Sequence, residues 1–197
     1  MKRVGVVLRI EEINSDFKHY VRDSVLNKLT KYDIEIICIP TINKITNIFH
    51  ILDNCDGIIL PGGDDITETD IKIIDYCYKL DIPTLGICLG MQEMSFYKKG
   101  LICDLNNKLH YNTSHNIKII KDSLLYKIFK KDTITVNSIH KSFVYKTYLN
   151  ISAISEDNII EAIEDPTKHF FVGIQWHPER MKEEESYLLF DYFINNL

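Results

Sequence analysis

Short runs of aliphatic residues alternate with longer amphipathic stretches through the first half of this chain. The apolar runs cover residues 4–10, 34–39, 57–60 and 84–87, and the amphipathic stretches cover roughly 19–31, 45–52 and 70–80. This strand and helix alternation predicts a parallel sheet covered by helices on both faces. The run Gly57–Leu60 is apolar throughout, as a strand buried on both faces requires.

After Lys99 the pattern changes to shorter apolar runs separated by polar turns. These runs cover residues 117–120, 134–136, 151–154, 159–163 and 170–174, and a final helix is expected over roughly 183–195. We expect them to extend the same sheet with antiparallel strands. The predicted fold is a three-layer α/β/α arrangement whose mostly parallel, flavodoxin-like central sheet has an antiparallel extension. With 197 residues, 45% of them hydrophobic, and no linker-like tract, residues 1–197 should form a single domain.

Composition excludes several classes of function. The net charge is −5 and basic residues are scattered among acidic ones, so nucleic acid is not an expected partner. The N-terminal apolar run ends at Arg9, and no run approaches the roughly 18 residues of a membrane span, which predicts a cytoplasmic protein without membrane contact. Five cysteines without a C-x-x-C pair argue against a disulfide scaffold and a structural zinc site.

Cys88 has the sequence setting of a nucleophile. It lies between the expected strand 84–87 and a following helix, flanked by Gly86 and Gly90 in a G-x-C-x-G pattern. Such a strand-turn-helix elbow holds its central residue in a strained backbone conformation and needs small neighbours. The helix N-terminus beside the sulfur would stabilise a thiolate. The other cysteines lack this glycine frame: Cys38, Cys55, Cys77 and Cys103.

His177 is the expected base for Cys88. A free thiol, with a pKa of about 8.5, is mostly protonated at neutral pH, so a cysteine nucleophile needs a proton acceptor. The apolar run 170–174 delivers His177 to the end of the sheet, Pro178 stops the strand, and Glu179 can orient the imidazole. The remaining histidines outside the 135–140 segment are expected to be structural or solvated: His19, His50, His110, His115 and His169.

Two further segments should lie at the same sheet edge. Gly62 and Gly63 follow the strand 57–60, and their backbone N–H groups, with that of Leu89, are the predicted oxyanion hole; an ordinary tight turn capped by Asp64 is the alternative. The segment 135–140 ends another strand with three polar residues that are expected to bind the amino-acid end of a substrate, unless they are turn and surface residues: Asn137, Ser138 and His140.

These motifs together resemble a known family. Residues 86–92 (GICLGMQ) and 175–179 (QWHPE) look like the nucleophile and His/Glu motifs of class I glutamine amidotransferases. Residues 60–63, 136–140 and 160–164, with Trp176, are similar to the γ-glutamyl-γ-aminobutyrate hydrolase branch. The resemblance implies a triad of Cys88, His177 and Glu179. It also implies glutamyl contacts from Gln92, Asn137, Ser138 and His140.

The sequence departs from that hydrolase branch in three places. Leu89 stands where the branch usually has arginine and where synthetase-linked glutaminases commonly have leucine. The branch's longer insertion after the Gly-Gly loop is absent, since Asp64 leads almost directly to the next helix. Lys141 and Ser142 replace the polar pair that usually follows the last histidine of the 136–140 motif.

The sequence therefore favours a γ-glutamyl hydrolase that cleaves a small-molecule glutamyl amide through a cysteinyl thioester, releasing glutamate and an amine. No metal or organic cofactor is expected. The alternative is a glutaminase subunit that supplies ammonia to a synthetase partner, which Leu89 favours. A third interpretation, a binding or regulatory module without activity, is opposed by the full set of expected catalytic residues.

Overall fold

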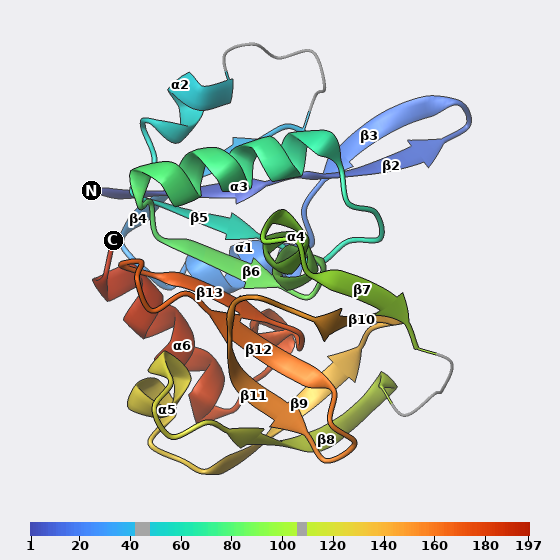
Figure 1. The fold of residues 1–197 in the computed structure, drawn as a ribbon. Helices are drawn as coiled ribbons and strands as arrows, with labels where there is room; N and C mark the ends of the chain where they lie inside the picture. Colours follow the sequence, from blue (N-terminus) through green and yellow to red (C-terminus); the bar gives the residue numbers. More distant parts are fainter. Residues whose placement is uncertain (42–47, 106–109) are drawn as a thin grey trace.

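A parallel sheet forms the centre of the computed structural model, which describes residues 1–41, 48–105 and 110–197. Its five strands lie in the order β4-β1-β5-β6-β13, the 2-1-3-4-5 order of flavodoxin-like sheets (Figure 1). Their bounds are β1 (Lys2–Val7), β4 (Ile34–Ile39), β5 (Gly57–Leu60), β6 (Thr84–Ile87) and β13 (Phe171–Ile174). The predicted fold class is confirmed.

Antiparallel strands continue the sheet beyond β13. They follow in the order β12 (Ile160–Glu164), β11 (Asn150–Ser155), β8 (Tyr111–Ile119) and β9 (Thr133–Ile139), while β10 (Ser142–Lys146) pairs with β12 and with β7 (Leu101–Asp104). The run 170–174 was expected within this antiparallel part, and that expectation is wrong. β13 pairs parallel to β6, with Gly173 opposite Gly86, because it completes the buried parallel core and meets the first antiparallel strand, β12, only on its other side.

Helices cover both faces of the sheet. On one face, α1 (Asp23–Leu29), α5 (Leu124–Phe129) and α6 (Glu184–Asn195) pack onto a core that includes Val6, Ile87 and Trp176. On the other, α2 (Ile48–Leu52), α3 (Glu68–Leu80) and α4 (Leu89–Tyr97) pack onto a core that includes Ile58 and Phe171. Side chains of β5 contribute to both cores, Ile59 to the first and Ile58 to the second, as its unbroken hydrophobicity predicts, whereas the apolar side chains of β6 contribute to the first. No helix within the described ranges is long and apolar enough to cross a membrane.

The N-terminal connection differs from the sequence prediction. The first strand ends at Val7 rather than residue 10, and the expected helix over 19–31 is shortened to α1. A hairpin of β2 (Arg9–Ile13) and β3 (Asp16–Tyr20) takes the intervening residues and projects from the sheet (Figure 1). Its turn residues Asn14 and Ser15 both have positive φ, as a tight two-residue hairpin turn requires. Residues 45–47 of the expected helix 45–52 lie outside the described residues.

Candidate active site

Cys88 stands at the junction of β6 and α4 in a strained backbone conformation. Its φ of 54° and ψ of −102° are values that residues with a β-carbon rarely adopt. The backbone N–H of Cys88 donates a 2.7 Å hydrogen bond to the carbonyl oxygen of Ile174, which ties the elbow to β13. The strand-turn-helix elbow predicted from the sequence is therefore present, with the sulfur at the N-terminal end of α4.

Two glycines allow this elbow to form. A β-carbon on Gly86 would lie 2.5 Å from the sulfur of Met94 and 2.7 Å from the carbonyl carbon of Gly90. A β-carbon on Gly90 would overlap the carbonyl group of Leu60 in β5. Both glycines are therefore required because α4 packs directly on the backbone of the sheet. This contact fixes the direction in which α4 leaves Cys88.

His177 reaches the elbow from the end of β13. Its Nδ1 atom lies 2.8 Å from Oε1 of Glu179, and both side chains are buried. Asn137 holds the backbone of the same residue: its amide nitrogen donates to the His177 carbonyl oxygen and its amide oxygen accepts from the His177 N–H, each at 2.8 Å. The Glu179 contact leaves Nε2 as the imidazole nitrogen available for proton exchange.

Cys88 and His177 line one cavity. A β-carbon on Gly62 would lie 2.8 Å from Cε1 of His177 and 3.6 Å from Cβ of Cys88, so both side chains border the same glycine. Burial alone would lower the pKa of His177, but its contacts with Cys88 and Glu179 outweigh burial and raise it to about 9. The imidazole therefore carries a proton at neutral pH, as a thiolate-imidazolium pair requires.

The Gly62-Gly63 loop is held by an arginine that sequence reasoning did not identify. Arg9, at the start of β2, donates from both Nε and Nη2 to the carbonyl oxygen of Pro61. A β-carbon on Gly63 would lie 2.9 Å from the Leu89 side chain and 3.0 Å from Arg9. The first turn of α4 leaves the N–H of Leu89 without an intrahelical partner. The predicted oxyanion donors thus lie on two packed segments, and their role stays a prediction.

A buried charge cluster anchors Arg9. Its guanidinium contacts Glu93 through two hydrogen bonds of 2.7 and 3.0 Å and lies 3.3 Å from Asp70. All three side chains are at most 5% exposed. Burial raises the pKa of Glu93 to about 8, opposed by Arg9 and reinforced by Asp70. One arginine facing two carboxyl groups therefore keeps a proton on the cluster at neutral pH.

The structure separates the predicted substrate-binding residues into two groups. Gln92 and His140 line the cavity, which has a volume of about 280 Å³. The Asn137 amide is engaged by the His177 backbone, and the Ser138 hydroxyl donates to the His110 carbonyl oxygen. Neither Asn137 nor Ser138 is among the described residues that line the cavity. Substrate contact remains a prediction for all four residues, with Asn137 placed to position His177.

The cavity also has charged residues that were not predicted as site residues. Three cations and one acid are among its lining side chains: Arg22, Lys141, Arg180 and Asp64. They come from segments far apart in the sequence, so no local pattern could have joined them. Both signs of charge at one small cavity are suited to a zwitterionic amino-acid ligand.

Comparisons with known proteins agree with this fold. A family model described as Peptidase C26 matches residues 67–179. A putative glutamine amidotransferase of Schizosaccharomyces pombe is 31% identical over 178 residues, covering 72% of this chain and 70% of that protein. A subunit of the glutamine-hydrolysing GMP synthase of Methanosarcina mazei is 29% identical over 190 residues, covering 94% of this chain and 95% of that protein.

A solved structure shows the same fold. A putative GMP synthase subunit from Thermoplasma acidophilum superposes with a TM-score of 0.79 at 18% identity, covering 100% of this chain and 94% of that one. Fold and site together define a class I glutamine amidotransferase-like protein, a type of cysteine-dependent amide hydrolase. The chain belongs to the Peptidase C26 family. The finer resemblance to the γ-glutamyl-γ-aminobutyrate hydrolase branch is not confirmed by these comparisons.

Proposed function

We propose that this chain is a glutaminase that hydrolyses the γ-amide of glutamine and supplies the ammonia to a synthetase partner. The observation that carries the proposal is the meeting of the Cys88 elbow with the buried His177–Glu179 pair at one small polar cavity. The relatives named above support glutamine as the substrate, because they include a glutamine amidotransferase and part of a glutamine-hydrolysing synthase. This reverses the preference drawn from the sequence.

The proposed reaction uses one proton carrier throughout. The Cys88 thiolate attacks the γ-carbonyl carbon of glutamine, and the oxyanion accepts hydrogen bonds from the N–H groups of Leu89 and of the Gly62-Gly63 loop. His177 gives its proton to the leaving nitrogen, ammonia departs, and a γ-glutamyl thioester remains. His177 then takes a proton from water, which attacks the thioester. Collapse releases glutamate and restores the thiolate-imidazolium pair.

The short connection after the Gly-Gly loop also supports a partnered glutaminase. Helix α3 begins at Glu68, only five residues beyond Gly63, with Thr67 as its N-cap in a capping box with Asp70. That connection leaves no room for the longer covering insertion expected of the hydrolase branch. A partner surface would then complete the site, and Leu89 beside the nucleophile agrees with the synthetase-linked type.

A γ-glutamyl-amine hydrolase is the second candidate. It is favoured by the similarity of residues 136–140 and 160–164 to that branch, and by the position of His140 in the cavity wall. The two candidates differ in the group that leaves: ammonia for a glutaminase, a larger amine for the hydrolase.

Glutamate release from free glutamine and from a panel of γ-glutamyl amines separates the candidates. We expect the purified chain to have a higher kcat/KM for glutamine than for any γ-glutamyl amine, and C88A to have no activity. A glutamine-like electrophile should add one covalent label to the wild-type chain and none to C88A, which tests the site even if turnover without a partner is slow. Faster cleavage of a γ-glutamyl amine would establish the hydrolase instead. Absence of both turnover and label would leave the binding-module interpretation.

A further inference from the structure

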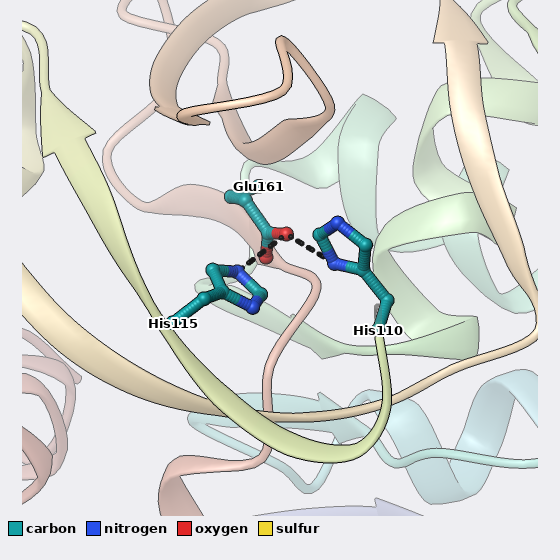
Figure 2. A group of neighbouring side chains, drawn as sticks. All are labelled: His110, His115 and Glu161. Carbon is teal, nitrogen blue, oxygen red and sulfur yellow. Dashed lines mark hydrogen bonds and ion pairs between the residues drawn. The ribbon is translucent and has the colours of Figure 1, made fainter. Parts of the chain in front are cut away.

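Three histidines surround one buried carboxylate behind the cavity wall. Glu161, on β12, is fully buried, and His110, His115 and His140 approach it from the segment before β8, from β8 and from the residue after β9. Figure 2 shows His110 and His115 converging on the carboxylate. From the sequence, His110 and His115 were expected to be structural or solvated, because neither has a setting comparable to that of His177. Strand pairing brings them together.

The distances in this cluster match those between donor atoms around one metal ion. Glu161 Oε1 lies 3.4 Å from His110 Nδ1, 3.1 Å from His115 Nε2 and 3.8 Å from His140 Nε2. The ligand atoms of His110, His115 and Glu161 all lie within 4.8 Å of one another. Ligands about 2.0–2.1 Å from a tetrahedral ion are separated by roughly 3.3 Å, so the donors of His110, His115 and Glu161 can surround one ion. His140 Nε2, on the same carboxylate oxygen, is the candidate for the fourth position.

In His140 and His110, the ring nitrogen that faces away from Glu161 has a partner of its own. The other ring nitrogen of each is thereby directed toward the Glu161 carboxylate. Nδ1 of His140 lies 3.0 Å from the carbonyl oxygen of Ser142, which only accepts, so Nδ1 carries the proton and Nε2 keeps a lone pair in the neutral ring. Nε2 of His110 lies 3.1 Å from the Asp157 carboxylate. An outer hydrogen bond of this kind is the usual support of a metal-ligating histidine.

Unpartnered atoms point to a missing ligand rather than to a satisfied polar core. His140 Nε2 and Glu161 Oε2 are both buried and have no hydrogen-bond partner among the described residues. Leaving such atoms unpaired costs about 1–3 kcal/mol each in a folded protein. His115 Nδ1 is unpartnered in the same way. In His140 and Glu161 the second polar atom, Nδ1 or Oε1, already has a contact. His140 Nε2 and Glu161 Oε2 are therefore free to coordinate an ion.

We propose that this chain binds one Zn²⁺ ion through Nδ1 of His110, Nε2 of His115, Nε2 of His140 and the Glu161 carboxylate. Three imidazoles and one carboxylate are a donor set suited to zinc, and four protein ligands make a closed, structural site. The ion would tie β8 and the end of β9 to β12. It would thereby fix His140 and the adjoining wall of the cavity, without taking part in the chemistry at Cys88.

Direct metal binding tests the proposal without reference to activity. The full chain, stripped with a chelator and checked for folding by circular dichroism, should take up one equivalent of Zn²⁺ in competition with a chromophoric chelator. Co²⁺ in its place should give the strong visible absorption of a tetrahedral site. Added Zn²⁺ should raise the Tm, because an ion bound only by the folded state stabilises it. A wild-type chain that takes up no equivalent of Zn²⁺ overturns the proposal.

Variants at the rim of the cluster supply the matched test. D157N keeps the four ligands but removes the charge behind His110, and should weaken Zn²⁺ binding by about 10- to 100-fold. H115A, at a partly exposed ligand, should lose more affinity than D157N. H50A, at an exposed histidine of α2, is the control and should bind as the wild type does. Equal binding by wild type, H50A and H115A would place the ion elsewhere and refute the assignment.

Discussion

Backbone strain at Cys88 determines how single substitutions there should behave. A residue with a β-carbon held in a rare backbone region costs about 1–3 kcal/mol, whereas glycine adopts it freely. The Cys88 φ of 54° and ψ of −102° lie in such a region. The reactive sulfur is therefore placed at the expense of stability, and removal of the β-carbon should recover part of that free energy.

C88G should be more stable than C88A by about 1 kcal/mol, although both lose activity. Elsewhere the order is reversed: at the exposed α3 position Lys72, glycine should be less stable than alanine by about 1 kcal/mol. Urea unfolding of the four variants measures both differences. If C88A proved the more stable of its pair, the elbow would not hold the strain that its dihedral angles indicate.

The His177 pKa gives a second prediction at this scale. Burial lowers it and the contacts with Cys88 and Glu179 raise it to about 9, so C88A should shift the imidazole titration to lower pH. The pKa of His177 in the folded state lies above its ordinary value of about 6.5. The contribution of protonated His177 to the free energy of unfolding is therefore complete below pH 6.5 and is lost as the pH rises through about 9. NMR titration of the His177 ring measures the shift. C55A, at a buried cysteine of the core on the opposite face of the sheet, should leave the His177 titration midpoint unchanged. An unchanged midpoint in C88A would mean that Cys88 does not contact His177.

The glycine frame of Cys88 and the strand end at His177 could be recognised in the sequence because each is a local pattern. Arg9, Asp70 and Glu93 could not, because they are distant in sequence and look like surface charges until the fold buries them. The convergence of His110 and His115 on Glu161 could not be predicted for the same reason. The residues of short sequence motifs could therefore be predicted, whereas the distant residues that hold those motifs in place could not.

At the scale of elements, Arg9 connects three parts of the site. It links the start of β2 to the loop after β5 through Pro61, and to α3 and α4 through Asp70 and Glu93. Lysine cannot replace all these contacts, because it lacks the planar fork of donors. The arginine therefore sets the position of the Gly62-Gly63 loop relative to the helix that begins after Cys88.

R9M should destabilise the fold by about 3–5 kcal/mol, because it leaves buried carboxyl groups without their cation. R9K keeps the charge and should fold, with a kcat for glutamine at least about tenfold lower and little change in KM, since the loop that stabilises the oxyanion loses its anchor. Thermal unfolding and steady-state kinetics measure the two effects.

Arg3 offers the matched control, because it pairs with Glu35 at the exposed surface. R3M should change stability by no more than about 1 kcal/mol and leave kinetics unaltered. If R9K retained the full kcat, the contacts of Arg9 would contribute to stability alone, and the proposed link to the oxyanion loop would be wrong.

Strands were predicted correctly where the segment is strongly hydrophobic. They were missed where contacts with distant segments determine whether a strand forms. The strands 34–39, 57–60 and 84–87 were predicted at their observed bounds, because each is a short run of mostly aliphatic residues. The β2–β3 hairpin was missed because it packs little of its own apolar surface and depends on positive φ at its turn. The partially exposed strands β7 and β10 stabilise one another through pairing, which no single segment reveals.

At the scale of the whole molecule, the described residues form two hydrophobic cores on opposite faces of the large sheet. The first core includes Trp176 and residues of β1, β6, β8 and β9, so it extends from the parallel strands into the antiparallel part. The second includes residues of β1, β5 and β10 and extends in the same way. Because both cores cross from one part to the other, neither part can lose its packing while the other keeps a complete core.

Unfolding should therefore be a single cooperative transition, which would support the prediction that residues 1–197 form one domain. Trp176 is the sole tryptophan and is buried beside His177, so its fluorescence reports on the active-site side of the sheet, whereas far-UV circular dichroism reports on every helix and strand. In urea, with a chelator present so that no metal contributes, the two signals should give the same midpoint and slope. A loss of circular dichroism at lower urea than the fluorescence change would mean that the antiparallel extension unfolds by itself, because its contacts across β12 and β13 would then be too weak to couple it to the parallel core.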